Sequence, residues 1–156
     1  MIEVVVTQKM LIEARKKAVE MGRIRNSILN GGGNLVGFVG EFVAQKVLGG
    51  EVSNTYDWDL VLEDGRRVDV KSKKTGVVPK DHYDCSVSGV TKRQDCDLYA
   101  FVRVKGDLSV AWFLGTKDSK EYFKKARFIK KGQADGDNGF VSRADVFNMK
   151  ISELDK

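Results

Sequence analysis

The stretch DLVLEDGRRVDVKSKK, residues 59–74, places two aspartates and a lysine on two segments with the composition of β-strands. Asp59 and Asp69 offer carboxylate oxygens, which are the ligands that Mg²⁺ prefers. Lys71 follows Asp69 by two residues, and side chains two apart in a strand point to the same face. An amine there can orient or help deprotonate an attacking water. These residues indicate either metal-assisted hydrolysis of a phosphodiester or an ordinary charged surface hairpin.

The turn between these strands determines whether the two aspartates meet. A two-residue loop at Asp64 and Gly65 would mix charged and apolar side chains on both faces of the hairpin. A three-residue loop over 63–65, with Gly65 in the left-handed conformation, instead pairs Asp59 with Asp69. This register turns the apolar residues to the core and leaves the charged residues on the other face. The apolar residues are Trp58, Leu60, Leu62, Val68 and Val70, and the charged residues are Asp59, Asp69 and Lys71. Because two opposed aspartates repel, a divalent cation between them would explain the pattern.

A third carboxylate lies upstream, in the segment NLVGFVGEFVAQKVL at 34–48. This segment is apolar almost all round, which predicts a buried helix with Asn34 as its N-cap and Gly49 as its end. Glu41 lies inside it, and a carboxylate in such a helix is costly unless it is paired, hydrogen-bonded or bound to a metal. Two interpretations of Glu41 stay open, a metal ligand and a structural ion pair with an arginine.

Glu41 shares one stripe of this helix with Gly37 and Gln45, since residues four apart lie on the same face. The small Gly37 is expected to allow another element to approach closely there. Gln45, one turn after Glu41, could add a polar contact to the same site.

The remaining sequence predicts an alternation of helices and strands. Helices are expected over 8–24 and 118–125, and strands over 56–62, 66–73, 83–88, 98–104 and 108–115, with a further strand in ARFIKKG and a short turn or helix in ISELDK. The segment NSILNGGGN is interpreted as a flexible connector, because no GK[ST] follows its glycines as a phosphate-binding loop requires. We predict one α/β domain over 1–156, with a central mixed β-sheet flanked by helices.

Composition limits the partners. The chain of 156 residues is 42% hydrophobic and can bury a core, while its net charge of +5 favours an anionic partner. Basic islands such as KSKK and KKARFIKKG suit phosphate contacts. No apolar run is long enough for a membrane span and the first residues lack the features of a signal peptide, so we expect a cytoplasmic protein. Cys85 and Cys96 form no CxxC motif and are expected to be free thiols.

The order of the acidic residues, helical Glu41, then Asp59 on a strand, then Asp69-x-Lys71 on the next strand, resembles the PD-(D/E)XK nuclease superfamily, which includes Holliday junction resolvases. Blocks such as NSILNGGGNLVGFVGEFVAQKVLGG, CDLYAFVRV and WFLG look like those of its small phage-type members, so the resemblance covers most of residues 15–150. It implies a restriction-endonuclease-like core that binds Mg²⁺ or Mn²⁺ through the three carboxylates, with Lys71 assisting the water. Trp58 replaces the proline that names the motif, a departure common in the family.

The sequence therefore predicts a Mg²⁺-dependent deoxyribonuclease with Glu41, Asp59, Asp69 and Lys71 as its catalytic residues. The alternatives are a non-catalytic nucleic-acid-binding module on the same fold and a protein whose charged hairpin has no role. The expected partner is nucleic acid, above all DNA, with a homodimer left open and no membrane; the expected location is the cytoplasm, including that of a virus-infected cell. Six further residues could line the nucleic acid: Lys73, Lys74, Lys80, His82, Lys92 and Arg93.

Overall fold

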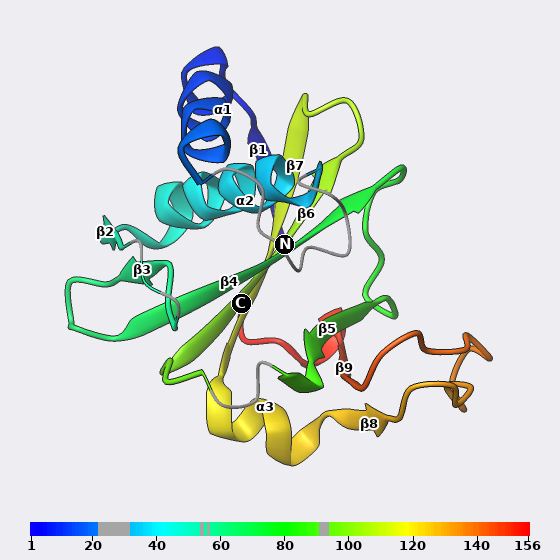
Figure 1. Cartoon of the computed structure of the whole chain (residues 1–156). Helices are drawn as coiled ribbons and strands as arrows, with labels where there is room; N and C mark the ends of the chain where they lie inside the picture. Colours follow the sequence, from blue (N-terminus) through cyan, green and yellow to red (C-terminus); the bar gives the residue numbers. More distant parts are fainter. Residues whose placement is uncertain (22–31, 54, 56, 91–93) are drawn as a thin grey trace.

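The computed structural model describes residues 1–21, 32–53, 55, 57–90 and 94–156 of the chain. Its largest element is a six-stranded sheet with the strand order β1-β7-β6-β4-β3-β2 (Figure 1). The strands are β1 (Ile2–Val5), β2 (Glu51–Val52), β3 (Leu60–Val61), β4 (Arg67–Thr75), β6 (Leu98–Lys105) and β7 (Val110–Asp118). β4 and β6 are parallel, and the other neighbouring strands of this sheet are antiparallel. The predicted α/β class with a mixed sheet is confirmed.

Two helices cover one face of this sheet, α1 (Gln8–Met21) and α2 (Gly32–Leu48) (Figure 1). α2 packs directly on β4 and β6, and α1 packs on α2. Val39 and Val43 of α2 are fully buried in a cluster that also contains Val68 of β4 and Val102 of β6. Because side chains alternate along a strand, the even-numbered residues of β4 face these helices.

The opposite face carries a small antiparallel sheet and one helix instead of further long helices. The small sheet has the order β5-β9-β8, formed by β5 (Asp84–Ser88), β8 (Arg127–Ile129) and β9 (Val146–Lys150), and the helix is α3 (Ser119–Lys125). A second buried cluster fills the space between, with Tyr99, Phe101, Leu114, Tyr122 and Met149 among its members. The predicted flanking by helices is therefore correct for one face and incomplete for the other.

Helix ends differ from the sequence predictions. α2 begins at Gly32, so Asn34 lies within its first turn and the predicted N-cap is wrong. The predicted end is confirmed, since Gly49 has φ 76° and its N–H donates to the carbonyl of Gln45 at 2.8 Å. The last residues of the helix predicted over 8–24, most of the glycine-rich connector, Lys92 and Arg93 lie outside the described residues.

Three strands were not predicted. β1 and β2 complete the large sheet at its two edges, and β9 is the central strand of the small sheet. The expected strand over 83–88 is confirmed as β5, whereas the strand expected over 56–62 contracts to the two residues of β3. β9 turns Phe147 and Met149 to the core and Asn148 to a polar cleft, but the apolar Val146 on the cleft side weakens the period-two pattern of VFNMK.

Two further expectations concern cysteines and membranes. Cys85 and Cys96 are both buried free thiols, as predicted. Within the described ranges, no helix is long and apolar enough to cross a membrane.

A glycine sets how closely α2 approaches the sheet, although it is not the one expected. A Cβ atom on Gly40 would lie 2.8 Å from Cβ of Ser72 on β4, which is closer than side chains tolerate. The predicted residue, Gly37, has no atom within 4 Å of such a position. Gly40 therefore permits the contact between helix and sheet that carries Glu41 toward the hairpin.

Replacing these two glycines should separate close packing from helix propensity. Gly40→Ala should destabilise the fold by about 1–3 kcal/mol, because the added methyl overlaps Ser72. Gly37→Ala is the matched control and should be neutral or stabilising by about 0.5–1 kcal/mol, since alanine favours a helix interior. Urea unfolding of both variants measures the difference. Equal stability of the two variants would contradict the close contact.

Candidate active site at the open end of the hairpin

The hairpin between β3 and β4 has the predicted three-residue loop. The N–H of Leu62 donates to the carbonyl of Arg66 at 2.9 Å, and the N–H of Gly65 donates back to Leu62 at 2.9 Å. Gly65 has φ 85°, the left-handed conformation that this loop requires. Leu60 pairs with Val68, so this part of the predicted register is confirmed.

Beyond this pair the register changes, and the predicted pairing of Asp59 with Asp69 is wrong. The ladder ends at Leu60, and the N–H of Asp59 donates to the carbonyl of Val68 at 2.9 Å. Asp59 and Leu60 thus both oppose Val68, which is the arrangement of a β-bulge. A bulge interrupts the alternation of side chains, so Trp58 joins the second core cluster instead of the cluster that contains Leu60.

The bulge directs the carboxylate of Asp59 at the edge of β4. Its Oδ2 accepts a hydrogen bond from the backbone N–H of Val70 at 2.7 Å. That N–H points to the edge that β3 would occupy if it continued, so the side chain takes the place of the missing strand. The carboxylate consequently lies at the open end of the hairpin, between the two faces of the sheet.

Asp69 and Lys71 lie on the face of β4 that is turned away from the helices. Asp69 is 5% exposed, and Lys71 Nζ lies 2.6 Å from its Oδ2 in an ion pair that is not aligned as a hydrogen bond. Gln94 joins the pair, because its Nε2 donates to Asp69 Oδ1 at 3.3 Å and its Oε1 accepts from Lys71 Nζ at 3.1 Å. The ammonium of Lys71 is thus held between a carboxylate and an amide.

Glu41 enters from the other face and is paired with a lysine of α1. Lys17 Nζ lies 3.4 Å from Glu41 Oε2, and it also lies 5.5 Å and 5.2 Å from the ring centres of Phe38 and Phe42. The ion pair considered for Glu41 thus exists, but its partner is a lysine and not an arginine. Gln45 takes no part in the site, since its Nε2 donates to the carbonyl of Gly50 at 3.3 Å, beyond the end of the helix.

The three carboxylates influence one another electrostatically. Burial, followed by the charge of Asp59, raises the pKa of Glu41 to about 7. Burial, followed by the charge of Asp69, raises the pKa of Asp59 to about 6. Burial also raises the pKa of Asp69, against the attraction of Lys71. Glu41, Asp59 and Asp69 therefore form one coupled group of negative charge, although they come from α2, the bulge and β4.

The oxygen atoms of this group are ligands that suit a hard divalent cation, but the three carboxylates do not converge on one point. All ligands would be carboxylate oxygens, and the buried Oδ2 of Asp69 already has a cationic neighbour, Lys71 Nζ at 2.6 Å. Yet no three histidine, cysteine, aspartate or glutamate side chains in the described part of the chain converge closely enough to ligate one ion. Lys17 and Lys71 occupy the positions next to Glu41 and Asp69 instead. A cation at this site would have to replace at least one of these lysine contacts.

Two residues of the site, Lys17 and Gln94, were not predicted. Lys17 follows Ala14 by three residues on the amphipathic first helix, so its place beside the apolar stripe was a usable signal. Gln94 lies in a polar loop before β6, and nothing in its local sequence indicates its contacts. Comparison with protein-family models gave no match for this chain, and comparison with curated proteins gave no significant match.

The raised pKa values predict an unusual dependence of stability on pH. Without metal, the free energy of unfolding should fall as the pH rises from about 4.5 to about 7. In this range the folded protein keeps protons on Glu41 and Asp59 that the unfolded chain has released. The stabilisation is therefore complete below the unfolded pKa values and is lost as the pH passes the folded ones.

Glu41→Gln should remove much of this slope, about 3 kcal/mol over the range, since one pKa unit corresponds to about 1.4 kcal/mol. Asp64→Asn is the control on the same hairpin, because its hydrogen bonds with Arg66 hold the pKa of Asp64 below its usual value, outside the range tested. Urea unfolding at several pH values in EDTA measures both. A slope that Glu41→Gln leaves unchanged would show that Glu41 is not the group responsible.

Proposed function

We propose that this protein is a Mg²⁺-dependent nuclease that hydrolyses phosphodiester bonds of DNA on a restriction-endonuclease-like core. The observation that carries the proposal is the coupled group formed by Glu41, Asp59 and Asp69 beside Lys71. Carboxylates that are partly buried and repel one another lower the stability of the fold. A cation bound between them would remove this cost. The order of helix, bulged strand and Asp-x-Lys strand supports the same family resemblance that the sequence carries.

The proposed roles follow from the type of each side chain and from the family resemblance. Glu41, Asp59 and Asp69 would hold the ion, which supplies a Lewis acid for the phosphate and lowers the pKa of a bound water. Lys71 is kept in place by Gln94, at 3.1 Å, and can stabilise the negative charge that builds on the phosphate or hold a proton of the attacking water. Asp59 is fixed by the N–H of Val70, so its second oxygen remains available as a ligand.

DNA as the substrate rests on charge. The chain carries a net charge of +5, and β4 continues beyond Lys71 with Lys73 and Lys74. Phosphate contacts of this kind make affinity depend steeply on salt concentration.

One observation favours the second candidate, a binding module without turnover. Lys17 and Lys71 already pair with two of the three carboxylates, and such pairs could be the final state of a site that has lost its ion. Metal affinity separates the candidates, because a binding module predicts no specific uptake of Mg²⁺ or Mn²⁺ in calorimetry, whereas the nuclease requires it.

Asp59→Asn should uncouple metal binding from stability. It removes one charged ligand and should weaken Mg²⁺ binding at least about tenfold, with loss of cleavage. The asparagine oxygen can still accept from Val70, and repulsion with Glu41 and Asp69 is relieved, so the metal-free protein should melt at the same or a higher temperature. A variant that melts lower yet still cleaves DNA would make Asp59 a structural residue and end the metal hypothesis.

Lys71→Ala should leave the ligands in place and slow the chemical step by about 10² to 10⁴. Single-turnover cleavage of labelled duplex, flapped and four-way-junction DNA with Mg²⁺, compared with EDTA, measures this. Lys105→Ala is the control, since Lys105 is 42% exposed and pairs with Asp107 away from the site. Equal rates for Lys71→Ala and the control would remove Lys71 from the mechanism.

A further inference from the structure

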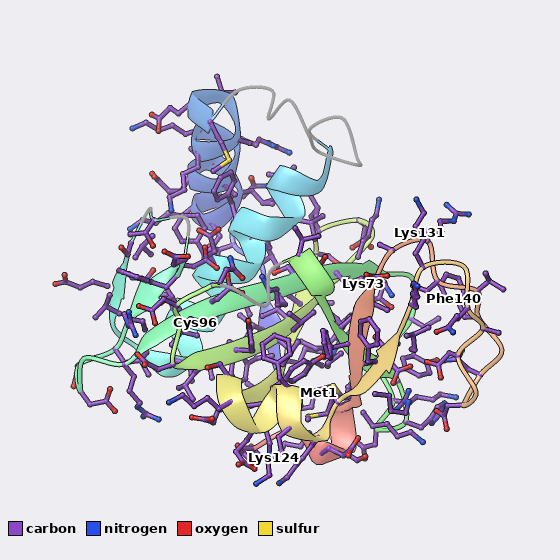
Figure 2. The ribbon with its side chains drawn as sticks, turned by 60° about the horizontal axis from the view of Figure 1, so that its bottom comes forward. Met1, Lys73, Cys96, Lys124, Lys131 and Phe140 are labelled. Carbon is purple, nitrogen blue, oxygen red and sulfur yellow. The ribbon has the colours of Figure 1, made fainter. Side chains whose placement is uncertain are left out.

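A cleft of about 880 Å³ lies beyond the far end of β4. The outer face of the small sheet forms one wall, because Cys85, Phe147 and Met149 point to the second core cluster while Ser86 and Asn148 alternate with them and line the cleft. The end of β4 and residues of the loop that precedes β9 close the remaining sides, and Figure 2 shows Lys73 and Phe140 on this side of the molecule. Its size is that of a ligand-binding pocket.

Two cations stand side by side at one wall of the cleft. Lys73 and Arg103 are direct neighbours in the parallel pairing of β4 and β6, and both side chains line the cleft. Arg103 is 8% exposed and donates to the carbonyl of Asp84, whereas Lys73 remains exposed. Partial desolvation and then the charge of Arg103 lower the pKa of Lys73, against the opposite effect of the charge of Asp84. Among the described residues no carboxylate lies within ion-pair distance of Lys73, so an anionic group would relieve this repulsion.

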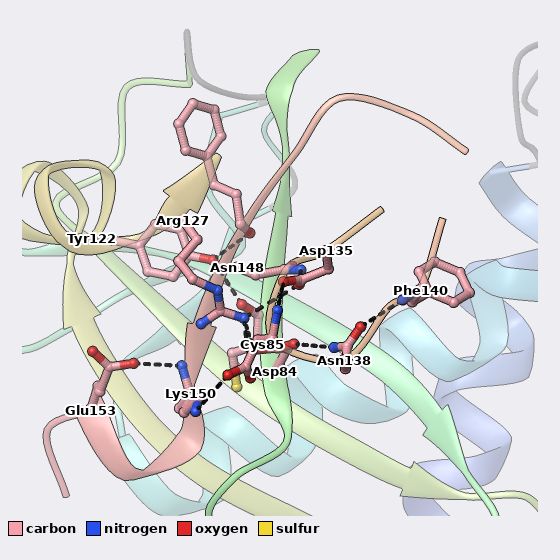
Figure 3. A network of polar contacts seen from close by, with 12 residues as sticks. Asp84, Cys85, Tyr122, Arg127, Asp135, Asn138, Phe140, Asn148, Lys150 and Glu153 are labelled. Atoms are coloured by element: carbon pink, nitrogen blue, oxygen red, sulfur yellow. Dashed lines mark hydrogen bonds and ion pairs between the residues drawn. The ribbon is translucent and has the colours of Figure 1, made fainter. Parts of the chain in front are cut away.

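The acidic residues of the cleft are already matched by other cations. Arg127 Nη2 lies 2.9 Å from Asp84 and 3.4 Å from Asp135 (Figure 3). Lys150 Nζ lies 3.2 Å from Asp137. The cations of this network lie on β8 and β9, whereas Asp84 begins β5 and both Asp135 and Asp137 lie in the loop that precedes β9. The network leaves the wall with Lys73 and Arg103 as the place for a negative ligand.

Asn148 offers an acceptor in the same cleft. Its Nδ2 donates to Asp135 Oδ2 at 3.2 Å, and since a carboxylate only accepts, this contact fixes the orientation of the amide. Its Oδ1 is buried and has no hydrogen-bond partner among the described residues. Such an atom is costly unless a ligand donates an N–H to it. Phe140, 65% exposed, lines the cleft as well and presents an aromatic ring.

A smaller cavity lies next to the cleft. It has a volume of about 130 Å³ and is lined by Lys71 as well as by Lys73 and Arg103, which also line the cleft. Lys71 and Lys73 lie two residues apart on one face of β4, about 6.6 Å along the strand. This spacing lets neighbouring phosphates of one strand contact the two lysines.

We propose that this cleft binds an unpaired nucleotide of a single-stranded segment of the substrate, with its phosphate at Lys73 and Arg103 and its base against Phe140 and Asn148. The proposal rests on the proposed nuclease function, which it deepens by naming the form of the substrate. A base in a duplex hides its Watson–Crick N–H groups in pairing, whereas an unpaired base can donate to Asn148 Oδ1 and stack on an aromatic ring.

Binding in EDTA tests this without any need for cleavage. Fluorescence anisotropy compares a labelled oligothymidylate, the same oligonucleotide with abasic sites, a blunt duplex and thymidine monophosphate as competitor. The intact single strand should bind about tenfold more tightly than the duplex or the abasic strand.

Lys73→Met should weaken single-strand binding about tenfold and reduce the slope of log affinity against log salt by about 0.7. Asn148→Ser should weaken only the intact strand. Lys124→Met, on exposed α3, is the control and should change neither quantity.

Three results would overturn the proposal: tighter binding of the duplex, equal binding of intact and abasic strands, or a monophosphate that competes as well as the oligonucleotide. Circular dichroism shows whether each variant is folded, and Lys73→Gln repeats the test if Lys73→Met does not fold. The binding experiment contains no metal, so its result does not depend on cleavage. Single-strand binding in EDTA, together with no cleavage in Mg²⁺, would reject the nuclease function but not the cleft. Cleavage together with failed single-strand binding would reject the cleft alone.

Discussion

The hydrogen bond from the N–H of Val70 to the carboxylate of Asp59 is the interaction on which the candidate site depends. A strand edge must satisfy its backbone donors, and here a side chain does so where β3 has ended. If β3 continued in register, Val70 would pair with backbone and Asp59 would turn to one face of the sheet. The bulge instead leaves the carboxylate at the edge, where a residue from either face can approach it.

The close packing of α2 on the sheet brings Glu41 toward Asp59 at this edge. Gly40 lets the helix lie against Ser72, two residues beyond Val70 on the same face of β4, and the next residue of the helix is Glu41. Asp69 belongs to the opposite face of β4, and its charge is the smallest of the causes that act on the pKa of Glu41. Asp59 lies between them and couples to both, so its charge raises the pKa of Glu41 as Asp69 raises that of Asp59. The carboxylate of Asp59, which has left the ladder, thus connects the carboxylates of α2 and β4.

Sequence reasoning found the acidic residues, the loop of the hairpin and the mixed sheet, because charge type, a glycine after aspartate and apolar periodicity are local signals. It failed where a contact between residues distant in the sequence determines the local structure. The bulge at Asp59 depends on how Val70 is satisfied, and the choice of Gly40 over Gly37 depends on where Ser72 lies. The apolar pattern of a helix predicts which of its faces is buried, but it does not predict which residues of another element pack against that face. Lys17 and Gln94 are in the site for similar reasons, since each is brought there by packing between distant segments.

The odd-numbered residues of β4 place opposite charges along one face of a single strand. Asp69 stands near the beginning, Lys71 follows it, and Lys73 stands beside Arg103 at the cleft. A polyanion laid along this face would have its phosphates attracted toward the lysines and repelled by the carboxylate, unless a cation neutralised that end. In the proposed nuclease, the metal and the nucleic acid should then bind with positive coupling, because each removes a repulsion that opposes the other. Lys71, between the two regions, is the residue through which that coupling would reach the scissile phosphate.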